Sequence, residues 1–178
     1  MKKIAIIGLG YVGLPLAVEF GKVRKTVGFD INFSRVEELK NSYDRTNETS
    51  AEDLSSASFL DYTNNISDIF DASIYIVTVP TPIDSAKRPV LTPLSAACEM
   101  IGTILCKNDL VIFESTVFPG ATEEICIPIL ERQSELIFNK EFFCGYSPER
   151  INPGDKINTL TKIKKITSGS NPEIAQEI

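Results

Sequence analysis

The chain has 178 residues, 43% of them hydrophobic, which is enough for one domain with a sizeable core. Its formal charge of −6 and isoelectric point near 4.8 argue against a nucleic acid or an anionic membrane surface as the main partner. No apolar run approaches the length of a membrane span, and Met1–Lys3 leads into a strand-like run without the features of a secretory signal, so we expect a cytoplasmic protein that enters no membrane.

A glycine-rich motif near the start of the chain is its most informative feature. The sequence Gly-Leu-Gly-Tyr-Val-Gly at positions 8–13 joins a strand-like run, Lys3–Ile7, to a helical stretch, Val12–Phe20. A second strand-like run, Thr26–Phe29, ends at Asp30. This order of strand, glycine-rich turn, helix, strand and acid is the fingerprint of dinucleotide-binding folds. A glycine-rich turn in an α/β protein that binds no dinucleotide is the alternative.

Each position of the motif has a physical role in binding a dinucleotide. Gly8 permits the tight turn, Gly10 lets the diphosphate approach the backbone, and Gly13 lets the helix pack closely on the strand. The helix start at Tyr11 and Val12 offers N–H groups and the positive end of the helix dipole to the phosphates. We therefore expect these five residues to bind the cofactor.

Asp30 is expected to select the cofactor. Its carboxylate is placed to accept hydrogen bonds from the ribose hydroxyls of adenosine, and its charge would repel a 2′-phosphate. NAD is therefore predicted in preference to NADP. A solvated acid at the end of a strand is the alternative.

The rest of the chain alternates strand-like and helical stretches, which predicts an α/β fold with a doubly wound parallel sheet, Rossmann-like, in three αβα layers. Further strands are predicted at Phe59–Thr63, Ser73–Val79, Leu110–Glu114, Phe142–Tyr146 and Lys165–Thr167. Further helices are predicted at Phe33–Lys40, Thr92–Lys107 and Pro119–Arg132, the last interrupted by Pro128, and from Pro172 after a capping Asn171. Residues 41–58 are interpreted as a surface excursion with one short helix.

Polar residues follow two of the predicted strands. Thr81 lies between two prolines after Ser73–Val79, and Ser115 and Thr116 follow Leu110–Glu114. The carboxyl ends of parallel strands meet at one edge of a sheet, where doubly wound folds place their ligands. We expect Thr81 to be held rigidly at this edge, and Ser115 and Thr116 to lie beside the nicotinamide. A structural turn and a strand-end cap are the alternatives.

The sequence has no histidine and four cysteines, Cys98, Cys106, Cys126 and Cys144. Histidine-based acid–base catalysis is therefore excluded, and any chemistry must use carboxylates, lysines, hydroxyls or thiols. The cysteines lack the spacing of a zinc site, so no metal is expected. Because each one falls in an apolar strand-like or helical stretch, we interpret all four as buried structural thiols.

Four segments, residues 8–15, 79–84, 114–122 and 145–154, together resemble the UDP-glucose/GDP-mannose dehydrogenase family. Within it they are most similar to the bacterial UDP-N-acetylhexosamine 6-dehydrogenases of surface-polysaccharide synthesis. The resemblance implies oxidation of the C6 alcohol of a UDP-sugar to a carboxylate with two NAD in succession. The route passes through an aldehyde held on a cysteine and a thioester that water hydrolyses.

The resemblance also implies a domain organisation. The catalytic cysteine of the family, with its assisting lysine, asparagine and aspartate, belongs to later segments than those present here. We therefore expect residues 1–178 to be the N-terminal NAD-binding domain, without the central helix that forms the dimer and without the UDP-sugar-binding domain. This chain alone is expected to bind NAD without turnover, and the full-length protein is expected to be a homodimer.

Further site residues follow from the resemblance. Thr116 is implied to position water or the reacting oxygen, and Glu149 to assist proton transfer or water activation. Arg150 and Asn152 are implied to contact the substrate, and Arg35 to lie near the adenosine. Solvated surface charges are the alternative for Arg35, Glu149 and Arg150.

The sequence leaves alternatives open for the sugar substrate and for the class of protein. UDP-glucose enzymes typically carry a second glutamate four positions after the first, where this chain has Pro153, which favours an N-acetylhexosamine. UDP-glucose and GDP-mannose remain open as substrates. A stand-alone NAD-binding regulatory module and a β-hydroxyacid dehydrogenase are the other candidates, although the latter lacks segments 79–84 and 147–154.

Overall fold

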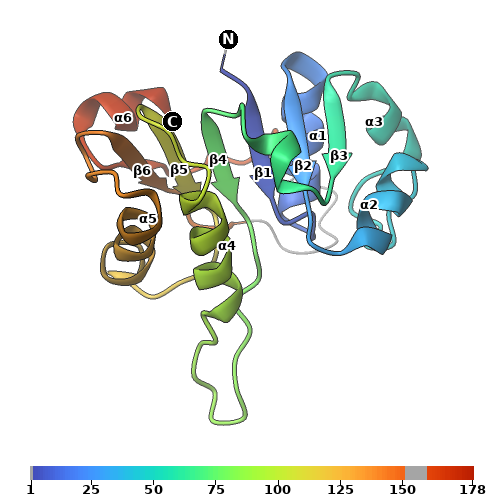
Figure 1. The fold of residues 1–178 in the computed structure, drawn as a ribbon. Helices are drawn as coiled ribbons and strands as arrows, with labels where there is room; N and C mark the ends of the chain where they lie inside the picture. Colours follow the sequence, from blue (N-terminus) through green and yellow to red (C-terminus); the bar gives the residue numbers. More distant parts are fainter. Residues whose placement is uncertain (1, 151–159) are drawn as a thin grey trace.

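Seven strands form one sheet in the order β3-β2-β1-β4-β5-β6-β7, in a computed structural model that describes residues 2–150 and 160–178 (Figure 1). The strands are β1 (Ile4–Ile7), β2 (Thr26–Phe29), β3 (Leu60–Thr63), β4 (Ile74–Val77), β5 (Asp109–Phe113), β6 (Phe142–Tyr146) and β7 (Ser168–Gly169). Neighbouring strands run parallel except β6 and β7, which are antiparallel. The predicted doubly wound α/β fold is confirmed, with a mostly parallel sheet.

Helices cover both faces of this sheet. They are α1 (Gly13–Val23), α2 (Phe33–Lys40), α3 (Ala51–Ser56), η1 (Ile66–Ile69), α4 (Thr92–Gly102), η2 (Thr122–Cys126), α5 (Ile127–Ser134) and α6 (Pro172–Glu177). None of the helices within the described ranges is long and apolar enough to cross a membrane.

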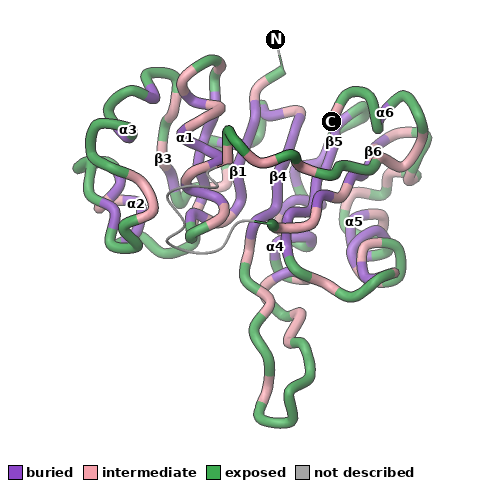
Figure 2. Tube along the Cα trace, turned by 180° about the vertical axis from the view of Figure 1, so that it is seen from behind, coloured by how far each residue is buried: buried purple, intermediate pink, exposed green. Residues whose placement is uncertain are grey.

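The core lies on both sides of the central strands, which are buried along their whole length (Figure 2). Successive side chains of a strand point to opposite faces, so Ile4 and Ile6 pack with α1, α3 and α6 while Ala5 and Ile7 pack with α4 and α5. Strands buried on both faces read as continuous apolar runs, which is why β1, β4 and β5 were recognisable in the sequence.

Pro128 interrupts its helix as predicted. The five residues before α5 form η2, a π-helical turn, in which the N–H of Ile127 bonds to the carbonyl of Thr122. Proline has no N–H, and its ring would clash with the carbonyl four residues earlier in an α-helix. The wider turn accommodates both constraints.

Two predicted elements are corrected by the structure. α4 ends at Gly102 and not at Lys107, because the following residues form tight turns that lead into β5. The last strand is Ser168–Gly169 and not Lys165–Thr167. The earlier position was suggested by β-branched residues, but one of these, Ile166, is exposed and does not belong to a buried strand.

Three of the four cysteines are buried as predicted, namely Cys98, Cys126 and Cys144, and burial raises the pKa of the Cys144 thiol well above its usual value. The prediction is wrong for Cys106, which is exposed. It lies beyond the end of α4, in the turn where Asp109 accepts a hydrogen bond from the Cys106 N–H. The early end of the helix therefore places this thiol outside the core.

Candidate functional site

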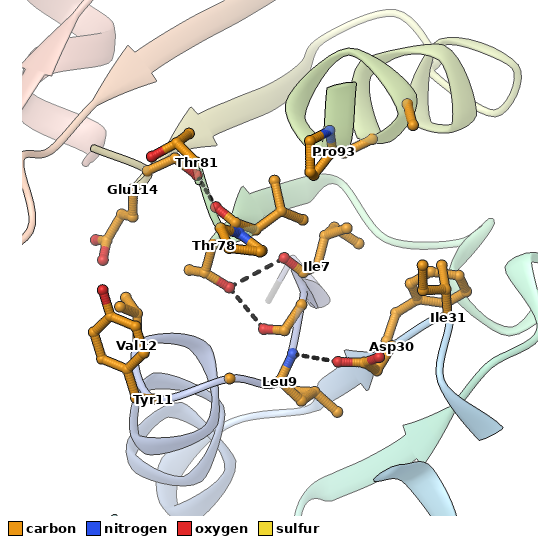
Figure 3. Close-up of a pocket in the computed structure, with 18 of the residues that line it drawn as sticks. Ile7, Leu9, Tyr11, Val12, Asp30, Ile31, Thr78, Thr81, Pro93 and Glu114 are labelled. Carbon is orange, nitrogen blue, oxygen red and sulfur yellow. Dashed lines mark hydrogen bonds between the residues drawn. The ribbon is translucent and has the colours of Figure 1, made fainter. Parts of the chain in front are cut away.

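A cavity of about 580 Å³ opens at the carboxyl ends of β1, β2, β4 and β5 (Figure 3). Its walls include Gly8 after β1, Asp30 after β2, Thr78 after β4 and Glu114 after β5. β1 and β4 are neighbours at the point where the strand order reverses, which is where doubly wound sheets bind their ligands. The volume is in the range of small-molecule sites.

The glycine-rich turn forms one wall of this cavity. Gly8 has a φ of +97°, a conformation that other residues rarely adopt. A Cβ added to Gly13 would lie 1.9 Å from the carbonyl oxygen of Gly8 and 2.3 Å from the hydroxyl oxygen of Thr78, so only glycine allows α1 to pack this closely. Gly10, Tyr11 and Val12 line the cavity, while Gly13 packs beneath them.

The start of α1 suits an anion. No side chain among the described residues caps this helix, and its first turn contains no acidic residue. The N–H groups of a helix start carry partial positive charge, and an acid there would compete with a bound phosphate. The arrangement at Val12 and Gly13 therefore fits the diphosphate of a dinucleotide.

Asp30 faces the same cavity from the end of β2. One oxygen of its carboxylate accepts a hydrogen bond from the N–H of Leu9 at 2.9 Å, and the other accepts one from Asn32 at 2.9 Å. Each carboxylate oxygen can accept a second bond, so the group is fixed in orientation and can still bind hydroxyls. Its position fits the ribose of an adenosine.

Arg35 does not line the cavity. Its side chain is buried, its Nε donates to the carbonyl oxygen of Leu9 at 2.9 Å, and its guanidinium lies 2.8 Å from the carboxylate of Asp44. The resemblance implies a place near the adenosine, which stays a prediction. The side chain reaches the backbone of the glycine-rich turn.

Thr81, Ser115 and Thr116 meet at the edge of β4 and β5, and all three line the cavity. The hydroxyl of Thr81 donates to the carbonyl of Thr116 at 2.6 Å, and the hydroxyl of Ser115 donates to the carbonyl of Val79 at 2.7 Å. These bonds tie together the two loops that leave the sheet here. With its proton engaged, the Thr81 hydroxyl can act towards a ligand only as an acceptor.

Glu114 and Lys165 form an ion pair that the sequence did not reveal. Their charged atoms are 2.6 Å apart, and the side chains are 8% and 17% exposed. Burial raises the pKa of Glu114, Lys165 opposes this rise, and the charge of Glu149 adds to it. Figure 3 shows the Glu114 carboxylate and the Tyr11 ring directed towards one another across the cavity.

Glu149 also lines the cavity, and its carboxylate accepts a hydrogen bond from the Arg150 N–H at 2.6 Å. The structure thus brings Glu149 close to Glu114 and Thr116, whereas the exposed Arg150 does not line the wall. Asn152 lies outside the described residues. An acid directly after a buried strand, as Glu114 is, was the available signal for a further site residue.

Comparison with known proteins also indicates a dinucleotide-binding domain. The NAD-binding domain model of the UDP-glucose/GDP-mannose dehydrogenase family matches residues 2–178. Over 174 residues the chain is 60% identical to UDP-N-acetyl-D-glucosamine 6-dehydrogenase of Pseudomonas aeruginosa, covering 98% of this chain and 41% of that protein. Over 175 residues it is 51% identical to protein CapL of Staphylococcus aureus, again covering 98% and 41%.

A solved structure of a dehydrogenase has a similar fold. That of UDP-D-ManNAc dehydrogenase from Pyrococcus horikoshii matches with a TM-score of 0.85 at 27% identity, covering 98% of this chain and 43% of that one. The chain therefore spans about two fifths of the length of the relatives it matches. A cavity built for a dinucleotide, and a family match along nearly the whole sequence, lead to one conclusion. This chain belongs to the UDP-glucose/GDP-mannose dehydrogenase family and is its NAD-binding domain.

Proposed function

We propose that this chain is the NAD-binding part of an enzyme that oxidises the C6 alcohol of a UDP-N-acetylhexosamine to the uronate for surface-polysaccharide synthesis. The cavity carries this proposal, because it brings a glycine-rich turn, Asp30, Thr116 and Glu149 to one edge of the sheet. Similarity to the Pseudomonas aeruginosa enzyme named above supports the sugar class. UDP-glucose is the alternative substrate.

Residues at different places along the cavity would contact different parts of NAD. The turn at 8–13 would hold the diphosphate and Asp30 the adenosine ribose, while Thr81 and Ser115 would lie beside the nicotinamide. Bound NAD supplies the acceptor for the hydride that leaves C6. Thr116 and Glu149 would then orient the reacting oxygen or water and carry its proton, since a positioned carboxylate can act as a general base.

The remaining features of the complete enzyme are part of the same proposal. A longer protein would add the nucleophilic cysteine, the UDP-sugar site and a homodimer interface, with residues 1–178 as the NAD-binding domain. Arg150 and Asn152 would approach the substrate. The cytoplasmic location expected from the sequence stays a prediction.

Substrate oxidation by the full-length protein tests the proposal. UDP-N-acetylglucosamine, UDP-N-acetylgalactosamine, UDP-N-acetylmannosamine and UDP-glucose are each supplied with NAD, and NADH is followed by its absorbance. We expect the highest kcat/KM with an N-acetylhexosamine and two NADH for each sugar oxidised. Preference for UDP-glucose would contradict the substrate class, and NAD binding without NADH from any sugar would favour a regulatory module.

A further inference from the structure

Two consecutive peptide groups of the glycine-rich turn are held by side chains from outside it. In the peptide joining Gly8 to Leu9, the carbonyl oxygen lies 2.7 Å from the Thr78 hydroxyl, and the N–H donates to Asp30 at 2.9 Å. In the peptide joining Leu9 to Gly10, the carbonyl accepts from Nε of Arg35 at 2.9 Å. Each contact fixes the plane of a peptide group that faces the cavity.

The bond from Arg35 also sets the direction of the Gly10 N–H. A trans peptide is planar, and its N–H points opposite to its C=O. Because Arg35 holds the carbonyl of Leu9, it also holds the next N–H. Within residues 2–150 and 160–178 no acceptor is bonded to that N–H, Gly10 lines the cavity, and a Cβ added to Gly10 would meet no atom within 4 Å. This donor is therefore available to a phosphate oxygen.

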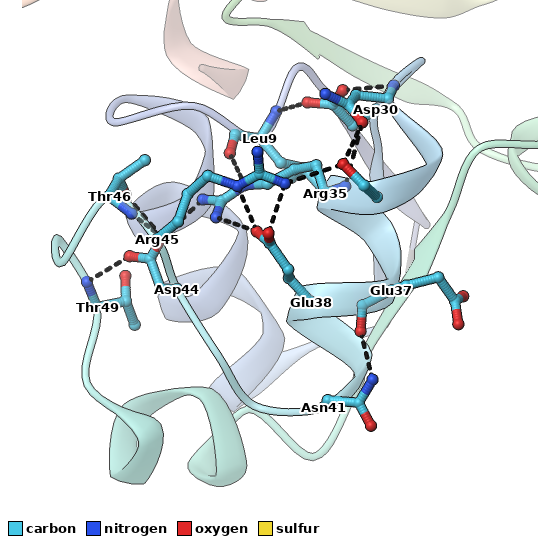
Figure 4. A network of polar contacts seen from close by, with 12 residues as sticks. Leu9, Asp30, Arg35, Glu37, Glu38, Asn41, Asp44, Arg45, Thr46 and Thr49 are labelled. Carbon is cyan, nitrogen blue, oxygen red and sulfur yellow. Dashed lines mark hydrogen bonds and ion pairs between the residues drawn. The ribbon is translucent and has the colours of Figure 1, made fainter.

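Arg35 is in turn held by a buried carboxylate, Asp44 (Figure 4). Their side chains are 6% and 1% exposed. Asp44 also accepts hydrogen bonds from the Thr46 N–H and hydroxyl, at 3.0 and 2.7 Å, and from the N–H groups of Glu48 and Thr49, both at 3.0 Å. A buried charge persists only when it is paired and hydrogen-bonded, and these contacts meet that condition and fix Asp44.

We propose that the Asp44–Arg35 pair positions the diphosphate-binding turn. Acting through the Leu9 carbonyl, it directs the Gly10 N–H at the cofactor. Asp44 and the residues that hold it, Thr46, Glu48 and Thr49, therefore support the NAD site although none of them lines the cavity. This inference rests on the NAD binding proposed above. It gives Arg35 a role through the backbone of the turn.

A neighbouring ion pair offers a matched control. Arg45 lies beside Arg35, where its guanidinium contacts the Glu38 carboxylate at 2.5 Å and the Ser34 hydroxyl at 3.0 Å (Figure 4). In the network that Figure 4 draws, Arg45 makes no contact with Leu9. Arg45→Met removes the same charge from the same region as Arg35→Met and removes no atom that contacts Leu9 or Asp44. It does release Glu38, whose carboxylate lies 3.7 Å from the guanidinium of Arg35.

Binding and backbone exchange together test the proposal. By calorimetry, Arg35→Met and Asp44→Asn should each weaken NAD binding by about tenfold, or about 1.4 kcal/mol, while Arg45→Met stays within about twofold. Without ligand, the amide of Leu9, which donates to Asp30, should exchange hydrogen faster in the first two variants only. Arg35→Lys, which keeps the charge beside Asp44 but lacks Nε, serves if Arg35→Met fails to fold.

Two probes separate positioning from direct contact. Adenosine lacks the diphosphate, so its binding, followed by NMR titration, should be unchanged in Arg35→Lys, while binding of ADP-ribose weakens. Equal loss for adenosine and ADP-ribose, or native NAD affinity in both Asp44→Asn and Arg35→Lys, would overturn the proposal. If the unaltered chain bound no NAD, the proposed function would fail, and the hydrogen exchange of the Leu9 amide would still report whether Arg35 holds the turn.

Discussion

At the scale of single residues, Asp30 serves both the fold and the cofactor site. Its carboxylate anchors the turn through Leu9 and its own loop through Asn32. The lone pairs that remain face the cavity, where ribose hydroxyls are the expected donors. A 2′-phosphate in the same place would meet a fixed negative charge. The preference for NAD over NADP should therefore depend on this side chain.

Asp30→Asn tests that dependence. We expect NAD affinity to fall by about tenfold, because a neutral amide is a weaker acceptor for ribose hydroxyls. Affinity for NADP should fall less or rise, so the ratio of the two dissociation constants moves towards one. Calorimetry with both cofactors measures this ratio. Asp61→Asn, which removes the same charge from the exposed face of β3, is the control and should leave it unchanged.

The pair Glu114–Lys165 yields a prediction about stability. Lys165→Met leaves Glu114 buried without its ammonium, which should cost about 3 kcal/mol of the free energy of unfolding at neutral pH. The pKa of Glu114 is already raised by burial, and loss of Lys165 should raise it further. A carboxyl with a raised pKa in the folded state stabilises the fold at low pH and loses that contribution as pH rises through the folded pKa.

Urea unfolding at a series of pH values measures this effect. The deficit of Lys165→Met should shrink as the pH is lowered towards the ordinary pKa of a glutamate, since Glu114 then becomes protonated. The double variant Glu114→Met with Lys165→Met removes both charges and should recover most of the lost stability at every pH. A deficit independent of pH would show that the ion pair is not its cause.

At the scale of elements, the turn and α1 need glycine for two different reasons. A Cβ at Gly13 would overlap the carbonyl of Gly8, whereas a Cβ at Gly10 would meet no atom within 4 Å. Gly13→Ala should therefore destabilise the domain by on the order of 3 kcal/mol. Gly10→Ala should keep stability within about 1 kcal/mol and still weaken NAD binding by tenfold or more, because the methyl group enters the cavity.

Thermal unfolding and calorimetry on the two variants check this contrast. Native NAD affinity in Gly10→Ala would contradict the close approach of the diphosphate to the turn. A fully stable Gly13→Ala would instead contradict the tight contact of α1 with Gly8 and Thr78.

Local patterns predicted the elements that depend on local chemistry. The bounds of Thr26–Phe29, Phe33–Lys40 and Phe142–Tyr146 were predicted as observed. The end of α4 was missed, because the apolar residues after Gly102 continue a helical pattern while the chain in fact turns towards β5. Such an ending depends on tertiary packing, which overrides propensity.

The same distinction applies to the candidate site, where local sequence patterns predicted some residues and missed others. The glycine-rich turn and Asp30 were found because spacing along the chain carries the signal. The ion pair of Glu114 with Lys165 joins residues 51 positions apart, and the pair of Arg35 with Asp44 depends on how a loop folds back. No local pattern encodes either contact, so only the folded chain could reveal them.

At the scale of the whole molecule, the cavity takes its walls from four strand ends that are far apart in the sequence. Cofactor binding should therefore stabilise the domain as a unit, by about 2.7 kcal/mol when NAD is present at a hundred times its dissociation constant.

The walls of the cavity, as far as residues 2–150 and 160–178 form them, contain no cysteine. The proposed thioester chemistry requires a thiol that this cavity does not supply.

The chain alone should thus bind NAD without oxidising a UDP-sugar. In one sample containing this chain, NAD and UDP-N-acetylglucosamine, we expect the unfolding temperature to rise with NAD concentration while no NADH forms. Because the rise of the unfolding temperature with NAD shows that the site is intact, the absence of turnover would not result from misfolding. Steady NADH production by the purified chain would mean that Thr116, Glu149 and their neighbours suffice for hydride transfer. The division of labour between this domain and the rest of a longer enzyme would then be wrong.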